Sequence, residues 1–312
     1  MSLRISTAPH VHNPVTTQRL MLYVIIALLP TAAAGVYLFG LPALLVLCVT
    51  TASAVLAEFI WQKIARQPVR VGDLSAVVTG LILGLTLPPQ APWWMAVIGS
   101  FFAIMIVKQL FGGLGDNFLN PALAARAVLL ASWPVHMTLY TLPTYFQSGV
   151  DAVSAATPLS TKAAGLMDLF LGRVPGSIGE VCKAAILLGL AFLLVTGTIR
   201  WRVPIVMLAS VFGWTWLLGG TPESALAALL SGGVLFGAVF MATDYVTSPI
   251  TPFAQIVYAF LAGLIIVLIR LYGSYPEGVT YGILLMNIAA PLLDRFLPQQ
   301  IYGIQKKEVK KA

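Results

Sequence analysis

Two parts of the sequence contain residue types that could do chemistry. In residues 151–159 an acidic residue, Asp151, precedes Thr157 by six positions among small side chains. By residue type alone, such a stretch is typical of an exposed polar loop in which Asp151 or Ser154 caps a short turn. The other feature is Arg126, a charge within an apolar run, which needs an anion, an acidic side chain or open backbone carbonyls as its partner.

The composition around these residues indicates a membrane protein. Of the 312 residues, 59% are hydrophobic and only 9% are charged, and the mean hydropathy is +0.91. Water-soluble domains contain about 25% charged residues, so this chain has too little charge to cover a globular surface in water. The composition therefore disfavours a soluble enzyme, a disordered chain and a partner role with nucleic acid, although the pI is about 9.5.

The chain is predicted to be an all-α polytopic membrane protein with about ten transmembrane helices, some of them short or broken. A helix needs about 20 apolar residues to cross a bilayer. The third and fifth candidate segments are only about 15 residues long and end at prolines, which is typical of broken helices whose free backbone groups line a polar interior. The candidates are residues 20–39, 41–62, 73–88, 92–111, 119–134, 178–197, 203–219, 225–243, 253–272 and 278–297.

The loop charges predict the orientation. Thirteen of the 18 Lys and Arg residues fall on the side that also holds both chain ends, which places both termini in the cytoplasm. The predicted organisation is a cytoplasmic segment 1–19, a first five-helix repeat 20–134, an extracytoplasmic loop 135–176, a second five-helix repeat 177–298 and a cytoplasmic basic tail 299–312.

The two halves resemble each other. Lys108 ends the fourth segment and Arg270 the ninth, while the third segment begins at Ser75 as the eighth does near Ser231. Five segments per repeat is an odd number, so the second repeat would be inverted relative to the first, as in many transporters. Chance similarity between helices rich in Leu, Ala and Gly is the alternative explanation.

Other charged residues are expected at helix ends. Lys108 and Arg270 would extend toward the membrane surface, and Glu58 would lie on a solvated face. Asp73 and Asp244 occupy equivalent places in the two halves, where they could cap helices or contribute to a cation pathway.

The stretch 151–157 resembles the signature at which a flavin transferase attaches FMN, through its phosphate, to a threonine hydroxyl. This signature belongs to the NqrB/RnfD family of membrane subunits, which serve the sodium-pumping NADH:quinone oxidoreductase and the Rnf complex respectively. Four residues match the signature, and alanines stand where the family usually has glycines at 152 and 155. The matching residues are Asp151, Ser154, Ala156 and Thr157.

Two further stretches resemble the same family, so the similarity covers essentially the whole chain. Residues 108–122 end in Asn-Pro-Ala, and residues 240–249 contain Met-Ala-Thr-Asp. The resemblance implies covalent FMN on Thr157 and, near the cytoplasmic side, a second non-covalent flavin, riboflavin or FMN, whose ligands the sequence does not identify. Arg126 would hold a flavin phosphate, a flavin ring oxygen or a carboxylate, or a structural partner instead.

The resemblance also implies a function. The chain would be a membrane subunit of an ion-translocating ferredoxin:NAD oxidoreductase, passing electrons coupled to Na⁺ or H⁺ movement in a bacterial cytoplasmic (inner) membrane. Its partners would be the other Rnf subunits (RnfA, RnfB, RnfC, RnfE and especially RnfG, which also carries covalent FMN), together with a flavin transferase and membrane lipid. Because it lacks nicotinamide and iron–sulfur motifs, it would have no complete enzymatic activity alone.

Two alternatives remain at this point. The first is the NqrB type of the quinone reductase, which is longer at its N-terminus; this chain begins about 20 residues before its first apolar segment, which favours the Rnf type. The second, from another class, is a solute channel or secondary transporter with the same inverted-repeat fold. The repeat would suit a transporter equally well, and only the motif around Thr157 and its companion stretches favour electron transfer.

Overall fold

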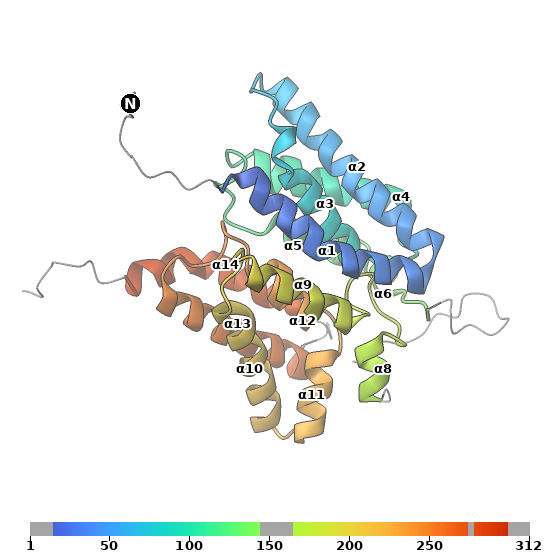
Figure 1. The fold of residues 1–312 in the computed structure, drawn as a ribbon, viewed down its shortest axis with the longest axis vertical. Coiled ribbons are helices and arrows are strands. Elements are labelled where there is room, and N and C mark those ends of the chain that lie inside the picture. Colours follow the sequence, from blue (N-terminus) through green and yellow to red (C-terminus); the bar gives the residue numbers. More distant parts are fainter. Residues whose placement is uncertain (1–14, 144–164, 274–277, 299–312) are drawn as a thin grey trace, which may run out of the picture.

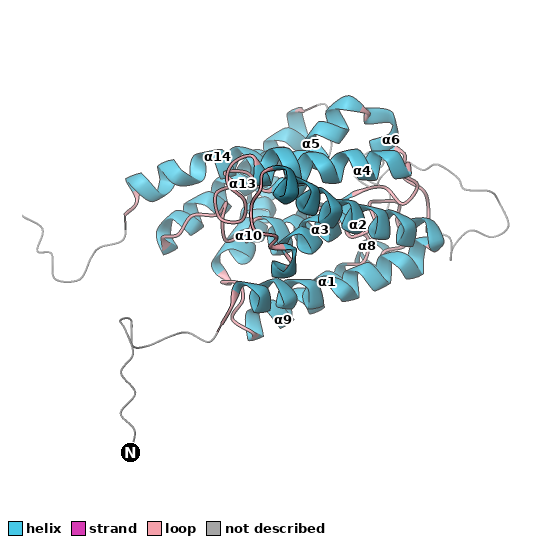
Figure 2. Ribbon diagram, turned by 90° about the horizontal axis from the view of Figure 1, so that it is seen from above, coloured by secondary structure: helices cyan, strands magenta, loops and turns pink. Residues whose placement is uncertain are grey.

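The computed structural model describes residues 15–143, 165–273 and 278–298, which form helices and no β-strand (Figures 1 and 2). The first half contains α1 (Thr17–Phe39), α2 (Leu41–Ile64), η1 (Val71–Asp73), α3 (Ser75–Thr86), α4 (Trp93–Phe101), η2 (Phe102–Gln109), α5 (Pro121–Ser132) and α6 (Pro134–Thr138). The second half contains α8 (Leu166–Leu171), α9 (Lys183–Val195), α10 (Arg202–Leu217), α11 (Pro222–Leu230), α12 (Val234–Phe236), η4 (Gly237–Met241), α13 (Pro252–Tyr272) and α14 (Val279–Phe296).

The helices confirm an all-helical membrane protein in the described residues. Helices α1, α2 and α13 are long and apolar enough to cross a membrane. A fourth crossing is added if α11 and residues 234–241, which meet at a bend of 67°, count as one broken span. Each of the ten predicted segments contains helical structure, and five of them form apolar helices of 10–17 residues.

Local sequence explains why the short helices begin where they do. Asn120 precedes α5, and its side-chain Oδ1 accepts hydrogen bonds from the backbone N–H groups of Ala122 and Leu123 at 3.1 and 3.3 Å. Pro121 occupies the first helical position, where its missing N–H costs nothing. The Asn-Pro pair therefore fixes the start of α5 in the interior of the protein.

The helices form two groups that meet along a buried apolar core (Figure 1). Helices α1 to α6 lie in one group, and α10 to α14 lie in the other. Helix α9 packs against α1, and α5 packs against α14, so these pairs connect the groups. Within the groups, α4 packs on α2 and α13 packs on α10.

A buried segment without helical structure, residues 174–181, crosses the junction between the groups. The N–H groups of Ile178 and Gly179 donate to the carbonyls of Leu87 and Leu85, at 3.2 and 2.7 Å, near the end of α3. Irregular backbone is tolerated at membrane depth where it is buried in protein and its polar groups are paired. The predicted sixth segment, 178–197, is therefore wrong at its start, because helix α9 begins only at Lys183.

We predict that Gly179→Ala destabilises the protein by about 1–3 kcal/mol, because overpacking a tight interior forces the neighbours to shift. A Cβ at this position would lie 2.7 Å from Leu85 Cβ and 3.0 Å from the Leu85 carbonyl oxygen. The measurement is thermal unfolding of the purified protein in detergent. Gly213→Ala is the matched control, since a Cβ there meets nothing within 4 Å; equal stability of the two variants would contradict the packing.

Candidate functional site

The predicted attachment motif lies outside the described residues. Asp151, Ser154, Ala156 and Thr157 belong to residues 144–164, which lie in the chain between α6 and α8. Their role stays a prediction. The described residues instead reveal cavities between the helices.

The first cavity, which we call the Lys108 cavity, is lined by both helix groups. Its cavity volume is about 80 Å³, and it is partly open to solvent. Its walls are mostly apolar, whereas Asn117, Asn120 and Lys108 are buried polar residues at its edge. An apolar pocket with a few converging polar groups is the usual form of a cofactor site. The apolar lining includes Val78, Ile82, Leu193, Ile199, Val239 and Phe240.

A glycine-rich turn places the two asparagines at this cavity. Gly112, Gly113 and Gly115 all have positive φ angles, of 124°, 101° and 107°, which L-residues with a Cβ rarely adopt. The side-chain amide of Asn117 then donates to the Leu119 carbonyl at 3.0 Å, and Asn120 begins α5. The family-like stretch 108–122 thus acts as one structural unit.

A buried ion pair lies beside the Lys108 cavity. Lys108 Nζ is 2.7 Å from Glu58 Oε1, and the two side chains are only 2% and 1% exposed. Gln109 Nε2 donates to the same carboxylate oxygen at 2.6 Å, and Lys108 Nζ donates to Ser75 Oγ at 2.5 Å.

The expectations that Lys108 extends to the surface and that Glu58 is solvated are therefore wrong. Residues 102–109 form a π-helix, η2, whose wider turn directs two consecutive residues, Lys108 and Gln109, toward Glu58 on α2. The sequence did contain a signal, because Glu58 and Lys108 lie near the same end of the second and fourth predicted segments, which would cross the membrane in the same direction.

A second cavity, the Arg126 cavity, lies at the end of α3. Arg126 is 4% exposed and donates through Nη1 to the Thr86 carbonyl, so it has a broken-helix carbonyl as one partner. Glu180, also buried, lines the same cavity, and its Oε1 accepts from Ser177 N–H at 2.9 Å. The structural role foreseen for Arg126 is thus present, and a role toward a flavin stays a prediction.

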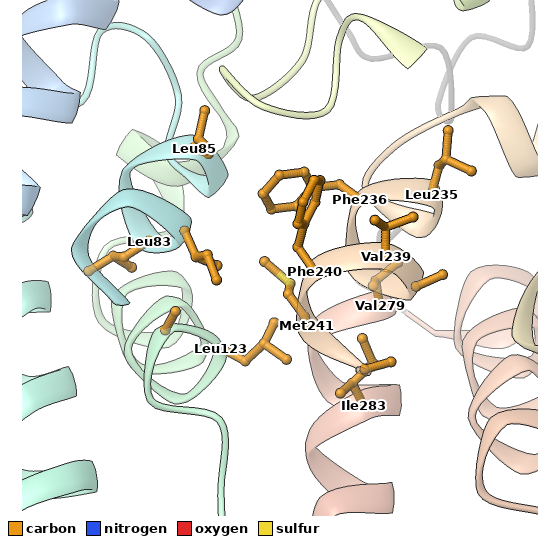
Figure 3. Packing of buried hydrophobic residues seen from close by; sticks show 14 of the residues in the cluster. Leu83, Leu85, Leu123, Leu235, Phe236, Val239, Phe240, Met241, Val279 and Ile283 are labelled. Atoms are coloured by element: carbon orange, nitrogen blue, oxygen red, sulfur yellow. The ribbon is translucent and has the colours of Figure 1, made fainter. Parts of the chain in front are cut away.

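Buried apolar side chains separate the two cavities. Phe240 lines the Lys108 cavity, whereas Phe236 and Met241 line the Arg126 cavity. The ring centroids of Phe236 and Phe240 are 5.1 Å apart. Both rings lie between leucines of α3 and the α14 residues Val279 and Ile283 (Figure 3).

The bend in the eighth segment is held by two basic residues from other helices. Arg270 donates to the carbonyls of Ala228 and Ser231 at 2.6 and 3.1 Å, and Lys183 donates to the Gly232 carbonyl at 3.4 Å. Cations favour the C-terminal end of a helix, where carbonyls lack partners. Arg270 therefore stabilises the end of α11 instead of extending to the surface as predicted. The Ser-Gly-Gly sequence at 231–233 could have located this break.

Asp73 and Asp244, which occupy equivalent places in the two halves of the sequence, have different contacts. Asp73 Oδ1 accepts from Ser75 N–H at 2.8 Å beside the start of α3, but the N-cap residue of that helix is Leu74, so Asp73 lies one position before the cap that it was predicted to form. Asp244 instead closes a turn, accepting from Thr247 Oγ1 at 3.1 Å, and it also lines the Lys108 cavity.

These features define an all-helical membrane protein with mainly apolar cavities between two helix groups, each cavity containing a few buried polar side chains. The family described as NQR2, RnfD, RnfE matches residues 4–303, and the chain belongs to that family, as its motifs predicted.

Several proteins are similar along almost their whole length, and each is named as the D subunit of an ion-translocating complex. The chain is 48% identical to that of the Na⁺-translocating ferredoxin:NAD⁺ oxidoreductase complex of Acetobacterium woodii, over 99% of each chain. It is 42% identical to that of the proton-translocating ferredoxin:NAD⁺ oxidoreductase complex of Clostridium ljungdahlii, over 97% of this chain and 96% of the relative. It is also 37% identical to that of the ion-translocating oxidoreductase complex of Pectobacterium carotovorum, over 97% and 99%.

We predict that Lys108→Met destabilises the protein by about 3–5 kcal/mol, because it leaves the Glu58 carboxylate buried without its charge partner. Arg173→Met is the matched control, since the Arg173–Asp168 pair is 3.9 Å apart and each side chain is 50% exposed; an exposed pair contributes at most about 1 kcal/mol. Thermal unfolding in detergent measures both variants. A Lys108→Met midpoint as high as that of the control would contradict a buried ion pair.

Proposed function

We propose that this chain is the D-type membrane subunit of an ion-translocating ferredoxin:NAD⁺ oxidoreductase. The observation that carries the proposal is the 48% identity along 99% of both chains to a protein of that name. The relatives are named after both Na⁺ and proton translocation, so the coupling ion of this chain is left open. The chain contributes electron transfer and ion movement, and other subunits bind ferredoxin and NAD⁺.

Within this complex, Thr157 is the attachment point of FMN. Support comes from the match of Asp151, Ser154, Ala156 and Thr157 to the attachment signature, in a loop that the charge distribution places outside the cytoplasm. A flavin accepts one or two electrons and so connects single-electron centres with hydride chemistry. The partners of this loop are a flavin transferase during maturation and the covalent flavin of RnfG during turnover.

The proposed topology has ten crossings in two inverted five-helix repeats, with both termini in the cytoplasm. Paired contacts support it. Ser100 Oγ connects α4 to the Thr50 carbonyl of α2, and Ser210 Oγ connects α10 to the Phe260 carbonyl of α13. Likewise, Lys108 contacts Ser75 at the start of α3, and Arg270 contacts Ser231 before α12.

The second, non-covalent flavin is proposed to bind in the Lys108 cavity. The residues present fit such a group, because the apolar walls suit the faces of a flat aromatic ring and the amides of Asn117 and Asn120 lie beside them. Lys108 belongs to the end of the fourth segment, on the predicted cytoplasmic side. Bound there, the flavin would supply electron transfer, and the chain would hold it away from water.

The ion route is proposed to run between the Lys108 and Arg126 cavities, past Phe236 and Phe240. Moving one charge against about 150 mV costs about 3.5 kcal/mol, and a two-electron step with a drop of about 75 mV supplies that amount. A modest difference in redox potential is therefore sufficient, provided that the apolar layer prevents uncoupled leakage.

Replacing the attachment residue tests the covalent flavin. Thr157→Ala is expected to abolish it without unfolding the membrane domain, because the hydroxyl is an anchor. The measurement is in-gel flavin fluorescence together with intact mass. Thr161→Ala, in the same loop, is the matched control and should keep the flavin; a covalent flavin retained in Thr157→Ala would refute the assignment.

Opening the apolar layer tests the ion route. The double variant Phe236→Ala and Phe240→Ala is expected to increase passive Na⁺ or H⁺ leakage through vesicles that contain the complex, because a hydrophobic constriction excludes water and ions. Phe253→Ala removes a ring from a residue that is 60% exposed and should not change the leak. Equal leakage in both variants would place the route elsewhere.

A further inference from the structure

The Lys108–Glu58 ion pair separates two cavities. Lys108 and Ser75 line the Lys108 cavity, whereas Glu58 and Gln109 line a different one, which we call the Glu58 cavity. The Glu58 cavity has a volume of about 510 Å³ and is partly open to solvent. The positive end of the pair therefore faces the Lys108 cavity, and the negative end faces away from it.

The ammonium group of Lys108 is held in place on more than one side. Glu58 Oε1 lies 2.7 Å from it, and Ser75 Oγ lies 2.5 Å from it. Ser75 is itself oriented by its hydroxyl, which donates to Asp73 Oδ1 at 2.6 Å. Since these groups are fixed and buried, Lys108 needs little reorganisation to act on a charge in the cavity, and the low local dielectric strengthens its field.

The Lys108 cavity is lined by one cation, Lys108, and one acidic residue, Asp244, among the described residues. The Asp244 carboxylate is oriented by Val246 N–H and Thr247 Oγ1, at 3.5 and 3.1 Å. A bound group would therefore lie in the field of the Lys108–Glu58 ion pair, which presents its ammonium end to the cavity, and of the Asp244 carboxylate.

We infer that the fixed positive charge of Lys108 raises the redox potential of the flavin bound in the Lys108 cavity. This inference rests on the proposed second flavin site. Each electron that enters a flavin from another redox centre adds one negative charge to the ring until a proton follows. A cation nearby stabilises that charge, so the reduced form gains stability relative to the oxidised form. Lys108 itself neither gains nor loses an electron and forms no bond.

The test removes both charges of the Lys108–Glu58 ion pair at once, so that neither residue is left as an unpaired buried charge. The whole complex is purified with wild-type chain, with the double variant Lys108→Gln and Glu58→Gln, and with Lys108→Arg. Non-covalent flavin is released by acid and quantified, and the flavin potentials are titrated electrochemically. Lys63→Gln is the control, because it removes an exposed lysine from α2, the helix that contains Glu58.

We expect the double variant to retain its non-covalent flavin and to show one flavin potential shifted to a more negative value, while the covalent flavins stay unchanged. Lys108→Arg, which keeps the positive charge, should retain most of the wild-type flavin potential. Lys63→Gln should show the same flavin potential as the wild type. An unchanged potential in the double variant, or loss of its flavin, would overturn the inference, since the pair would then not tune the flavin. A wild-type complex without non-covalent flavin would instead overturn the proposed second flavin site itself.

Discussion

The structure depends on one constraint, which is that a charge or an open backbone carbonyl buried among apolar helices must have a partner. The chain meets it by pairing features from distant segments. Lys108 pairs with Glu58, and Arg126 binds the carbonyl that ends α3. Arg270 likewise binds the end of α11. Short helices are therefore tolerated in the interior, because basic residues from other helices satisfy their ends.

The cavities follow from the same constraint. Where α3 and α11 end inside the protein, the chain leaves the Arg126 cavity, which Arg126 and Glu180 line, and Phe236 and Phe240 lie between it and the Lys108 cavity. Such an arrangement suits a protein that must keep electrons and ions on controlled routes. A fold alone hosts many functions, so the functional conclusion depends on the family, to which residues 4–303 belong.

Much of the fold could be predicted from the sequence because apolar runs, prolines and caps act locally. The ten apolar segments and the short helices α3 and α5 follow from such patterns. The Lys108–Glu58 pair could not be derived in this way, because it joins residues 50 positions apart through a π-helix. The buried segment 174–181 was likewise missed, because its apolar composition resembles a helix while its glycines allow close contact with α3.

As the proposed D-type subunit, this chain is an essential membrane component of a ferredoxin:NAD⁺ oxidoreductase. The most direct measurement is NAD⁺ reduction driven by reduced ferredoxin, with ion uptake followed in parallel, in membrane vesicles from cells that lack only this chain. We expect both activities to be lost together and to return together when the chain is supplied again. Vesicles that retain ferredoxin-driven NAD⁺ reduction and ion uptake without the chain would contradict it.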